Sequence, residues 1–85
     1  MPVIRRFLGI IILMYWRDHN PPHIHAKYNE YEISISLTGE ILSGFLPSRS
    51  LKLVKEWIKI NRKSLEQNWS KAQIGEKLEY IKPLE

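Results

Sequence analysis

All three histidines of the chain lie within one seven-residue segment, at His19, His23 and His25. His23 and His25 are separated by one residue, so on a β-strand their imidazoles lie side by side on one face. The double proline that precedes them forms a rigid turn, because two consecutive prolines fix φ and remove two amide donors. That turn holds His19 and Asp18 close to the start of the strand. The segment therefore predicts a cluster of three imidazoles and one carboxylate.

Metal binding is one use of such a cluster. Two strand histidines, together with His19 or Asp18, supply the nitrogen and oxygen ligands that zinc, nickel or iron accepts. A catalytic zinc site uses three ligands of this kind and leaves one position open for water. No cofactor is predicted beyond such a divalent metal. Its candidate ligands are Asp18, His19, His23 and His25.

Acid–base catalysis is a second use. An imidazole gains and loses a proton near neutral pH, so one histidine can take a proton while another gives one, which is the minimum needed to cleave RNA through its own 2′-hydroxyl. His23 or His25 would be the general base, and the other one or His19 the general acid. Lys27 or Arg17 would stabilise the charge on the phosphorane. A third interpretation is structural, with the histidines hydrogen-bonded beside a turn on a partly exposed sheet face.

A second candidate site is a row of basic residues at spacings of three and four in the C-terminal half, which places them on one face of a helix. Such a row can contact the phosphates of a nucleic acid, although a solvated helix face is the commoner reason for this pattern. Glu56 and Glu66 interrupt the row and can pair with its cations. The nucleic-acid-binding candidates are Arg17, Lys52, Lys55, Lys59, Arg62 and Lys63.

The composition limits the class of protein. The chain has 85 residues, which we interpret as a single domain over residues 1–85. It has no cysteine, which excludes a disulfide framework and a thiol nucleophile and favours the reducing cytoplasm. A formal net charge of +4 favours an acidic partner. The apolar run behind Arg5 and Arg6 is too short to span a membrane and lacks a signal-peptidase site, so neither export nor membrane insertion is expected.

The elements that must position the cluster are strands in the N-terminal half. A first strand is predicted from Phe7 to Arg17, where a continuous apolar run indicates burial on both faces. Alternation from His23 to Leu37 predicts a hairpin with a two-residue turn at Asn29-Glu30. Its register pairs Tyr28 with Tyr31 and places the apolar residues on one face. The opposite face then carries His23, His25, Lys27, Glu32, Ser34 and Ser36.

Helical periodicity dominates the C-terminal half. After a short strand from Glu40 to Phe45, one long helix is predicted from Ser48 to Asn68, followed by a short helical turn at Lys71–Ile74 that Gly75 stops. A last short strand is predicted at Leu78–Ile81, before Pro83. The predicted class is α+β, an antiparallel sheet of three or four strands packed on one long helix. The apolar stripe of that helix consists of Val54, Trp57, Ile58, Leu65 and Trp69.

Several short motifs accompany the segment Asp18-His19-Asn20-Pro21-Pro22-His23-x-His25-Ala26-x-Tyr28, namely Phe7-x-Gly9-Ile10, Gly44-x-Leu46-Pro47, Glu56-Trp57 and Asn68-Trp69. In these motifs the chain resembles a family of small bacterial proteins catalogued as domain of unknown function 4160. The resemblance implies a cytosolic protein encoded beside another small protein, similar to a toxin–antitoxin pair. It also implies that the three histidines, with Asp18 beside them, are the signature residues of the family. The family has no established activity, so the resemblance assigns no role to them.

The leading hypothesis from the sequence is one component of a two-protein, toxin–antitoxin-like module. Its histidine-bearing sheet face and nearby basic residues would engage RNA or an acidic partner, with metal-independent ribonuclease activity as one form of that engagement. Whether the chain is an enzyme stays open. The alternatives are a divalent-metal-binding domain that uses the histidine cluster and a non-catalytic protein-binding or antitoxin module. A small protein partner is expected, with RNA and a second copy of the chain as further candidates.

Overall fold

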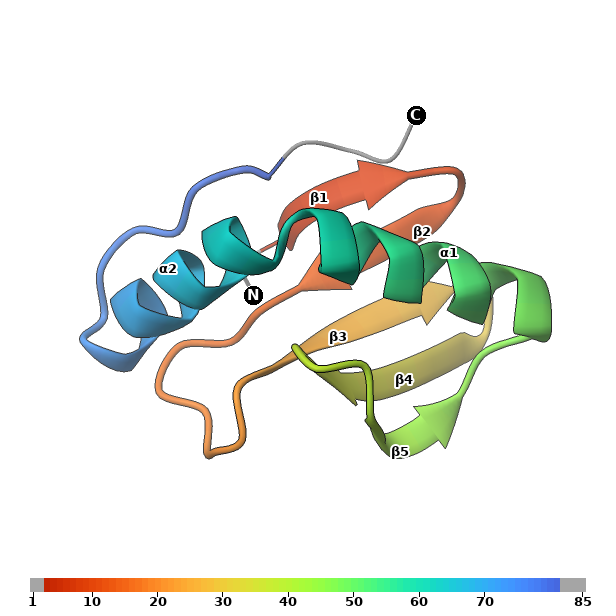
Figure 1. The fold of residues 1–85 in the computed structure, drawn as a ribbon, viewed down its shortest axis with the longest axis horizontal. Coiled ribbons are helices and arrows are strands. Elements are labelled where there is room, and N and C mark those ends of the chain that lie inside the picture. Colours follow the sequence, from red (N-terminus) through yellow and green to blue (C-terminus); the bar gives the residue numbers. More distant parts are fainter. Residues whose placement is uncertain (1–2, 82–85) are drawn as a thin grey trace.

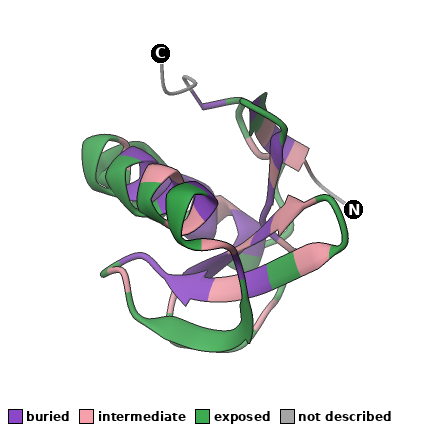
Figure 2. Cartoon of the chain, turned by 90° about the vertical axis from the view of Figure 1, so that its right-hand side faces the viewer, coloured by how far each residue is buried: buried purple, intermediate pink, exposed green. Residues whose placement is uncertain are grey.

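The structure, a computed structural model that describes residues 3–81, has two layers, an antiparallel sheet and a pair of helices on one of its faces (Figures 1 and 2). The sheet has five strands in the order β1-β2-β3-β4-β5, so each strand pairs with its neighbours along the chain. The α+β class is confirmed, but the prediction of three or four strands and one long helix is wrong. The elements are β1 (Val3–Phe7), β2 (Ile10–Leu13), β3 (His23–Tyr28), β4 (Tyr31–Ser36), β5 (Ile41–Phe45), α1 (Ser48–Ile60) and α2 (Arg62–Gln73).

The predicted first strand, Phe7 to Arg17, is wrong because the chain reverses within it. Leu8 and Gly9 have φ of 49° and 80°, and Phe7 pairs with Ile10 across them. Positive φ at both central residues defines the two-residue hairpin turn whose twist matches that of the flanking strands. One glycine is the only signal of this turn inside the apolar run. β2 then ends at Leu13, and the chain leaves the sheet before it returns as β3.

The β3–β4 hairpin has the predicted register. Tyr28 lies opposite Tyr31, and Asn29 at the turn has φ 54°, a left-handed conformation that asparagine tolerates better than most residues. The core face carries the buried residues Ile24, Ala26, Ile33 and Ile35. The opposite face carries His23, His25 and Lys27 from β3 and Glu32, Ser34 and Ser36 from β4. The short strand predicted at Glu40 to Phe45 is β5.

The predicted long helix is two helices, because the chain breaks at Asn61. Asn61 has φ −106° and ψ 20°, and its backbone N–H and side-chain Nδ2 both donate to the Trp57 carbonyl, at 3.0 and 3.1 Å. α2 extends to Gln73 and so includes most of the helical turn predicted separately at Lys71–Ile74. Gly75, with φ 77°, follows the end of the helix as predicted.

The apolar stripe of the two helices covers the apolar face of the sheet. All five predicted stripe residues are buried, and Trp57 stacks on Phe7 with ring centroids 5.6 Å apart. Figure 2 shows buried helix turns facing the sheet and exposed turns facing away, while the edge strand β5 is exposed along its whole length. Burial of each large apolar side chain contributes roughly 1.5–3 kcal/mol to stability. This contact therefore fixes which face of β3 is turned away from α1.

Residues 76–81 do not form the predicted last strand at Leu78–Ile81. The Ile81 N–H donates to the Ile4 carbonyl at 3.0 Å, and the Asn68 side chain exchanges hydrogen bonds of 2.8 and 3.0 Å with the backbone of Glu79. These contacts hold an irregular segment between α2 and β1. Pro83, expected to follow it, lies outside the described residues. In the described part of the chain, no helix has the length and apolar character needed to cross a lipid bilayer.

Candidate metal centre

The turn that carries the histidine motif is docked on the end of α2. The backbone N–H of Arg17 donates to the Ala72 carbonyl at 3.0 Å, and Gln73 Nε2 donates to the Asp18 carbonyl at 3.1 Å. Arg17 lies in a turn before Asp18 and has φ 56°. The end of α2 therefore helps to hold Asp18 beside the start of β3.

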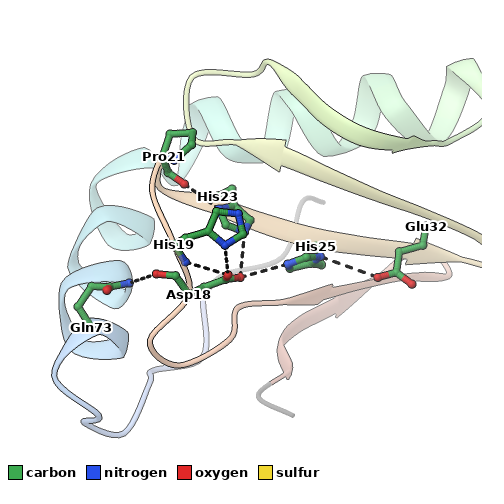
Figure 3. Close-up of polar contacts among 7 residues, drawn as sticks. All are labelled: Asp18, His19, Pro21, His23, His25, Glu32 and Gln73. Atoms are coloured by element: carbon green, nitrogen blue, oxygen red, sulfur yellow. Dashed lines mark hydrogen bonds and ion pairs between the residues drawn. The ribbon is translucent and has the colours of Figure 1, made fainter.

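The Asp18 carboxylate is the common contact of all three histidines (Figure 3). Its Oδ1 accepts the His19 backbone N–H at 2.9 Å and lies 3.0 Å from His19 Nδ1. Its Oδ2 lies 2.9 Å from His23 Nε2 and 3.5 Å from His25 Nε2. The structure thus brings together the four residues that the sequence places in one cluster.

His23 is the buried member of the cluster. Its side chain is 2% exposed, and its ring packs against Trp69 of α2 with centroids 5.3 Å apart. Nδ1 lies 2.7 Å from the Pro21 carbonyl oxygen and Nε2 faces Asp18, so both ring nitrogens meet an oxygen acceptor. The hairpin register places His23 on the face opposite the core, but the turn and Trp69 enclose the ring. The sequence predicted that the His23 ring lies on an open surface, and this prediction is wrong.

His25 is the more accessible of the two strand histidines. Its side chain is 20% exposed, its ring lies 5.2 Å from that of His23, and Tyr15 packs edge-on against it at 4.5 Å. Nε2 faces Asp18, while Nδ1 lies 3.8 Å from Glu32 Oε2 on β4. One nitrogen of the ring thus points into the cluster and the other toward a second carboxylate.

His19 lies at the solvent-exposed rim. Its side chain is 85% exposed, and its ring centroid is 5.5 Å from that of His23. The ring contacts Asp18 through the carboxylate oxygen that the two strand histidines do not use. His19 is therefore positioned to approach the cluster from the solvent side.

The environment of Asp18 keeps the carboxylate ionised. Partial burial opposes ionisation, but the hydrogen bond from the His19 backbone, the electrostatic interaction with His23 and the side-chain bonds from His25 and His23 outweigh it. Together they hold the pKa of Asp18 below its ordinary value. The cluster therefore offers an anionic oxygen beside two imidazole nitrogens.

The spacing of the three inner residues fits a metal ion. Asp18, His23 and His25 each offer one ligand atom, and these atoms all lie within 4.8 Å of one another. Two ligands bound tetrahedrally to zinc at about 2.0–2.1 Å are roughly 3.3 Å apart. The distances of 2.9 and 3.5 Å from Asp18 Oδ2 to the two Nε2 atoms bracket that value. Two imidazoles and one carboxylate are a donor set that zinc or iron(II) accepts.

The predicted charge-stabilising residues lie outside this cluster. Lys27 is two residues beyond His25 on β3, and its Nζ lies 3.9 Å from Glu32 Oε1. The Arg17 guanidinium lies beside Gly75, just past the end of α2. These cations therefore do not converge on the histidines.

The basic row on the helices is exposed, with Lys52, Lys55 and Lys59 on α1 and Arg62 and Lys63 on α2. Its pairing with acidic residues is weaker than the sequence suggested. Arg62 Nε lies 3.3 Å from Glu66 Oε2, but Glu56 forms no ion pair with another described residue. Most of the row therefore keeps its charge uncompensated within the described structure.

Sequence reasoning missed the residues that support the cluster. Glu32 could have been identified, because the correct hairpin register places it one pair away from His25 on the same face. Gln73 and Trp69 reach the cluster from α2, and no local pattern links them to the histidine motif. Pro21 contacts His23 through its backbone carbonyl oxygen. A contact of this kind cannot be predicted from the type of side chain.

The family model described as Domain of unknown function (DUF4160) matches residues 9–70. That range includes the histidine cluster, the whole of α1 and most of α2. No curated protein and no solved structure matches the chain.

Proposed function

The chain belongs to the DUF4160 family, whose description assigns no activity, and we therefore propose a function from the geometry of the cluster: Asp18, His23 and His25 bind one divalent transition-metal ion. Zinc and iron(II) suit two imidazoles and one carboxylate, and geometry and availability decide between such metals. The proposal develops one of the alternatives that the sequence left open.

The observation that carries this proposal is that both ring nitrogens of the buried His23 face acceptors. The Pro21 carbonyl oxygen can only accept a hydrogen bond, so Nδ1 carries a proton. In a neutral ring Nε2 then has a lone pair, directed at the Asp18 carboxylate 2.9 Å away. The lone pairs of His23 Nε2 and of the carboxylate oxygen repel each other. A cation between the two atoms is therefore needed to hold them this close. That charge is either a second proton on His23 or a metal ion.

Two features favour a metal ion over a proton. The Nε2 atoms of His23 and His25 approach the same oxygen of Asp18, and one metal ion can bind all three atoms where one proton joins only two. The outer nitrogens of both rings also face oxygen atoms, of the Pro21 backbone and of Glu32. Metal-binding histidines usually donate their second N–H to such a carbonyl or carboxylate.

Three protein ligands leave at least one coordination position open. Asp18 and His25 are 17% and 20% exposed, so solvent reaches the cluster on their side. A divalent metal lowers the pKa of a water bound at an open position, which is the chemistry that hydrolytic metal sites use. The sequence also offered His19 as a ligand, but it lies at the exposed rim outside the group of three ligand atoms, where it would bind the ion only after moving toward it.

The metal-independent ribonuclease hypothesis draws less support from this geometry. It requires two imidazoles that exchange protons with RNA, whereas His23 is 2% exposed and has both nitrogens engaged. Lys27 and Arg17, its charge-stabilising candidates, lie outside the cluster. That hypothesis and the two-protein module stay predictions.

Cobalt(II) titration of metal-stripped protein, made without a polyhistidine tag, tests the proposal. We expect one ion per chain and a visible d–d absorption band. His25→Gln should weaken binding at least roughly tenfold, while Lys27→Gln, on the same strand face, should leave it unchanged. Circular dichroism checks that both variants are folded. Absence of stoichiometric binding, or equal affinity of His25→Gln and the unsubstituted protein, would refute the metal site.

A further inference from the structure

A second feature of the fold is a cavity of about 430 Å³ where the helices face the β4–β5 turn. Its floor is apolar and buried, formed by Leu37 and Ile58, which are 4% and 2% exposed. Its polar lining residues come from both layers, Lys55, Lys59 and Arg62 from the helices and Thr38 and Gly39 from the turn. None of these residues belongs to the histidine cluster, so the cavity is a separate site.

The helical wall of the cavity concentrates positive charge. Lys55 and Lys59 are four residues apart on α1, a spacing at which like charges repel each other and destabilise the helix. The break at Asn61 separates them from Arg62 at the start of α2, which lines the same cavity. The lining contains no acidic residue, and among the described residues only Arg62 has an ion-pair partner, Glu66 at 3.3 Å. A solvated helix face accounts for the exposure of these cations, whereas their convergence on one cavity also suits an anionic ligand.

The β4–β5 turn contributes Thr38 and Gly39 to the lining and holds one backbone N–H that is not used within the described structure. In the β4–β5 turn, the N–H groups of residues 36, 37, 39 and 40 donate to Glu40 O, Pro22 O, Ser36 O and Ser36 Oγ, respectively. The Thr38 N–H has no acceptor among the described residues. Its hydroxyl is held 2.8 Å from Ser36 Oγ, which orders the turn. The cavity is therefore lined by three cations from the helices and by a turn residue, Thr38, whose N–H has no acceptor in the described structure.

We propose that this cavity binds the phosphate group of a phosphorylated ligand. A phosphate supplies several acceptor oxygens and a negative charge, which match two ammonium groups, a guanidinium and a backbone N–H. The three cations are exposed, so water screens their individual attractions, and their convergence on one cavity is what favours a phosphate there. This inference goes beyond the metal site and does not depend on it.

A second, smaller cavity of about 190 Å³ continues the first one. The two share Leu37, Thr38 and Arg62 in their linings, and the smaller cavity reaches Pro21 and Pro22. The carbonyl of Pro21 is the oxygen that His23 Nδ1 contacts. A longer ligand that extended from the basic cavity toward the histidine turn would pass Glu66, which also lines the smaller cavity and pairs with Arg62.

Calorimetric and amide NMR titrations with inorganic pyrophosphate and with a short single-stranded RNA test this proposal. A chelator in every buffer keeps the result independent of the metal site. Lys59→Gln, inside the cavity, should weaken pyrophosphate binding roughly tenfold, since a hydrogen bond to a charged group is lost. Lys63→Gln is the matched control, because it removes an exposed charge of the same row outside the lining. The Thr38 amide resonance should shift on saturation.

The two probes distinguish the source of the phosphate. Competition between pyrophosphate and RNA would support a site for phosphodiesters, and binding of pyrophosphate alone would support a site for a small phosphorylated ligand. Equal weakening by Lys59→Gln and Lys63→Gln would overturn the proposal, because it would show attraction by the net charge alone. The proposal would also be overturned if the Thr38 amide resonance did not shift, or if neither pyrophosphate nor RNA bound.

Discussion

Asp18 contacts three histidines, yet each histidine has a different surrounding. His23 is enclosed by the turn and Trp69, His25 lies half-buried on the sheet face, and His19 is at the rim. The buried ring fixes the geometry because its outer nitrogen is held by a backbone carbonyl. In the proposed metal site, His23 would be the enclosed ligand and His25 the ligand that solvent reaches.

Glu32 should affect the proposed metal site through His25. Its Oε2 lies 3.8 Å from His25 Nδ1, close enough to attract an N–H at that nitrogen, and Glu32 is not one of the proposed ligands. We predict that Glu32→Gln weakens cobalt binding about 10–100-fold, the usual effect of removing such a partner, without loss of the fold. Glu30→Gln, on the adjacent hairpin turn, is the control. Unchanged affinity of Glu32→Gln in the cobalt titration would show that Glu32 has no role in the site.

Asp18 should make the stability of the metal-free protein depend on pH in the acid range. The pKa of Asp18 is lowered in the folded state, so its contribution is present above the unfolded pKa of about 3.9 and is lost as the pH falls through the folded value. We predict that Asp18→Asn is less stable than the unsubstituted protein at pH 5, and that this difference shrinks toward pH 3. Urea unfolding at both pH values measures it. A difference that grows on acidification would contradict the direction of the shift.

At the residue scale the sequence was informative only where the contacts are local. The alternation after the double proline predicts that His23 and His25 are neighbours on one face, because the side-chain period of a strand is two. It cannot predict that His23 is buried, because the covering ring of Trp69 arrives from α2. The same holds for Gln73, which anchors the Asp18 backbone from the end of that helix.

At the scale of elements, single backbone positions decide where strands and helices end. Gly9 permits the turn between β1 and β2, and Asn61 separates α1 from α2 through its bonds to the Trp57 carbonyl. Gly44 is the most constrained glycine. It has φ 85°, and an added Cβ would clash with the Glu32 carbonyl oxygen.

We predict that Gly44→Ala is destabilised by about 2 kcal/mol or more, because it combines a strained φ with a clash against the backbone of β4. Gly39→Ala is the matched control. Gly39 also has positive φ, at 94°, but nothing lies within 4 Å of the added Cβ, so the cost should be limited to the strain of about 1 kcal/mol. Urea unfolding gives both values. Equal destabilisation of the two variants would show that the close approach at Gly44 has no effect.

Hydrophobic patterning correctly predicted those helices and strands in which many apolar residues recur at a regular spacing. The β3–β4 hairpin and the helical stripe follow from several side chains in phase, so both were correct. The β1–β2 turn and the break at Asn61 each depend on one or two residues inside an otherwise regular pattern, so they were missed. The number of strands and helices was therefore wrong although the class was right.

At the scale of the whole molecule, the proposed metal would join distant parts of the chain. Asp18 belongs to a turn docked on α2, whereas His23 and His25 belong to β3 in the sheet. An ion bound by all three residues therefore links the helical layer to the sheet and should stabilise the folded state.

Zinc at a free concentration of 100 times its dissociation constant should raise the free energy of unfolding by about 2.7 kcal/mol. For a chain of this size that corresponds to about 10–20 °C in Tm. His23→Gln should lose this shift, whereas Lys63→Gln, on the exposed helix face, should retain it. Thermal unfolding with and without zinc measures the effect, and an equal shift in both variants would point to non-specific binding.

The central claim is tested most directly by a crystal structure of the zinc-loaded protein with anomalous scattering data on both sides of the zinc edge. The account predicts one anomalous peak, about 2.0–2.2 Å from Nε2 of His23, Nε2 of His25 and a carboxylate oxygen of Asp18. A peak elsewhere on the molecule would contradict it, as would no peak at all with His23 Nε2 bonded directly to Asp18.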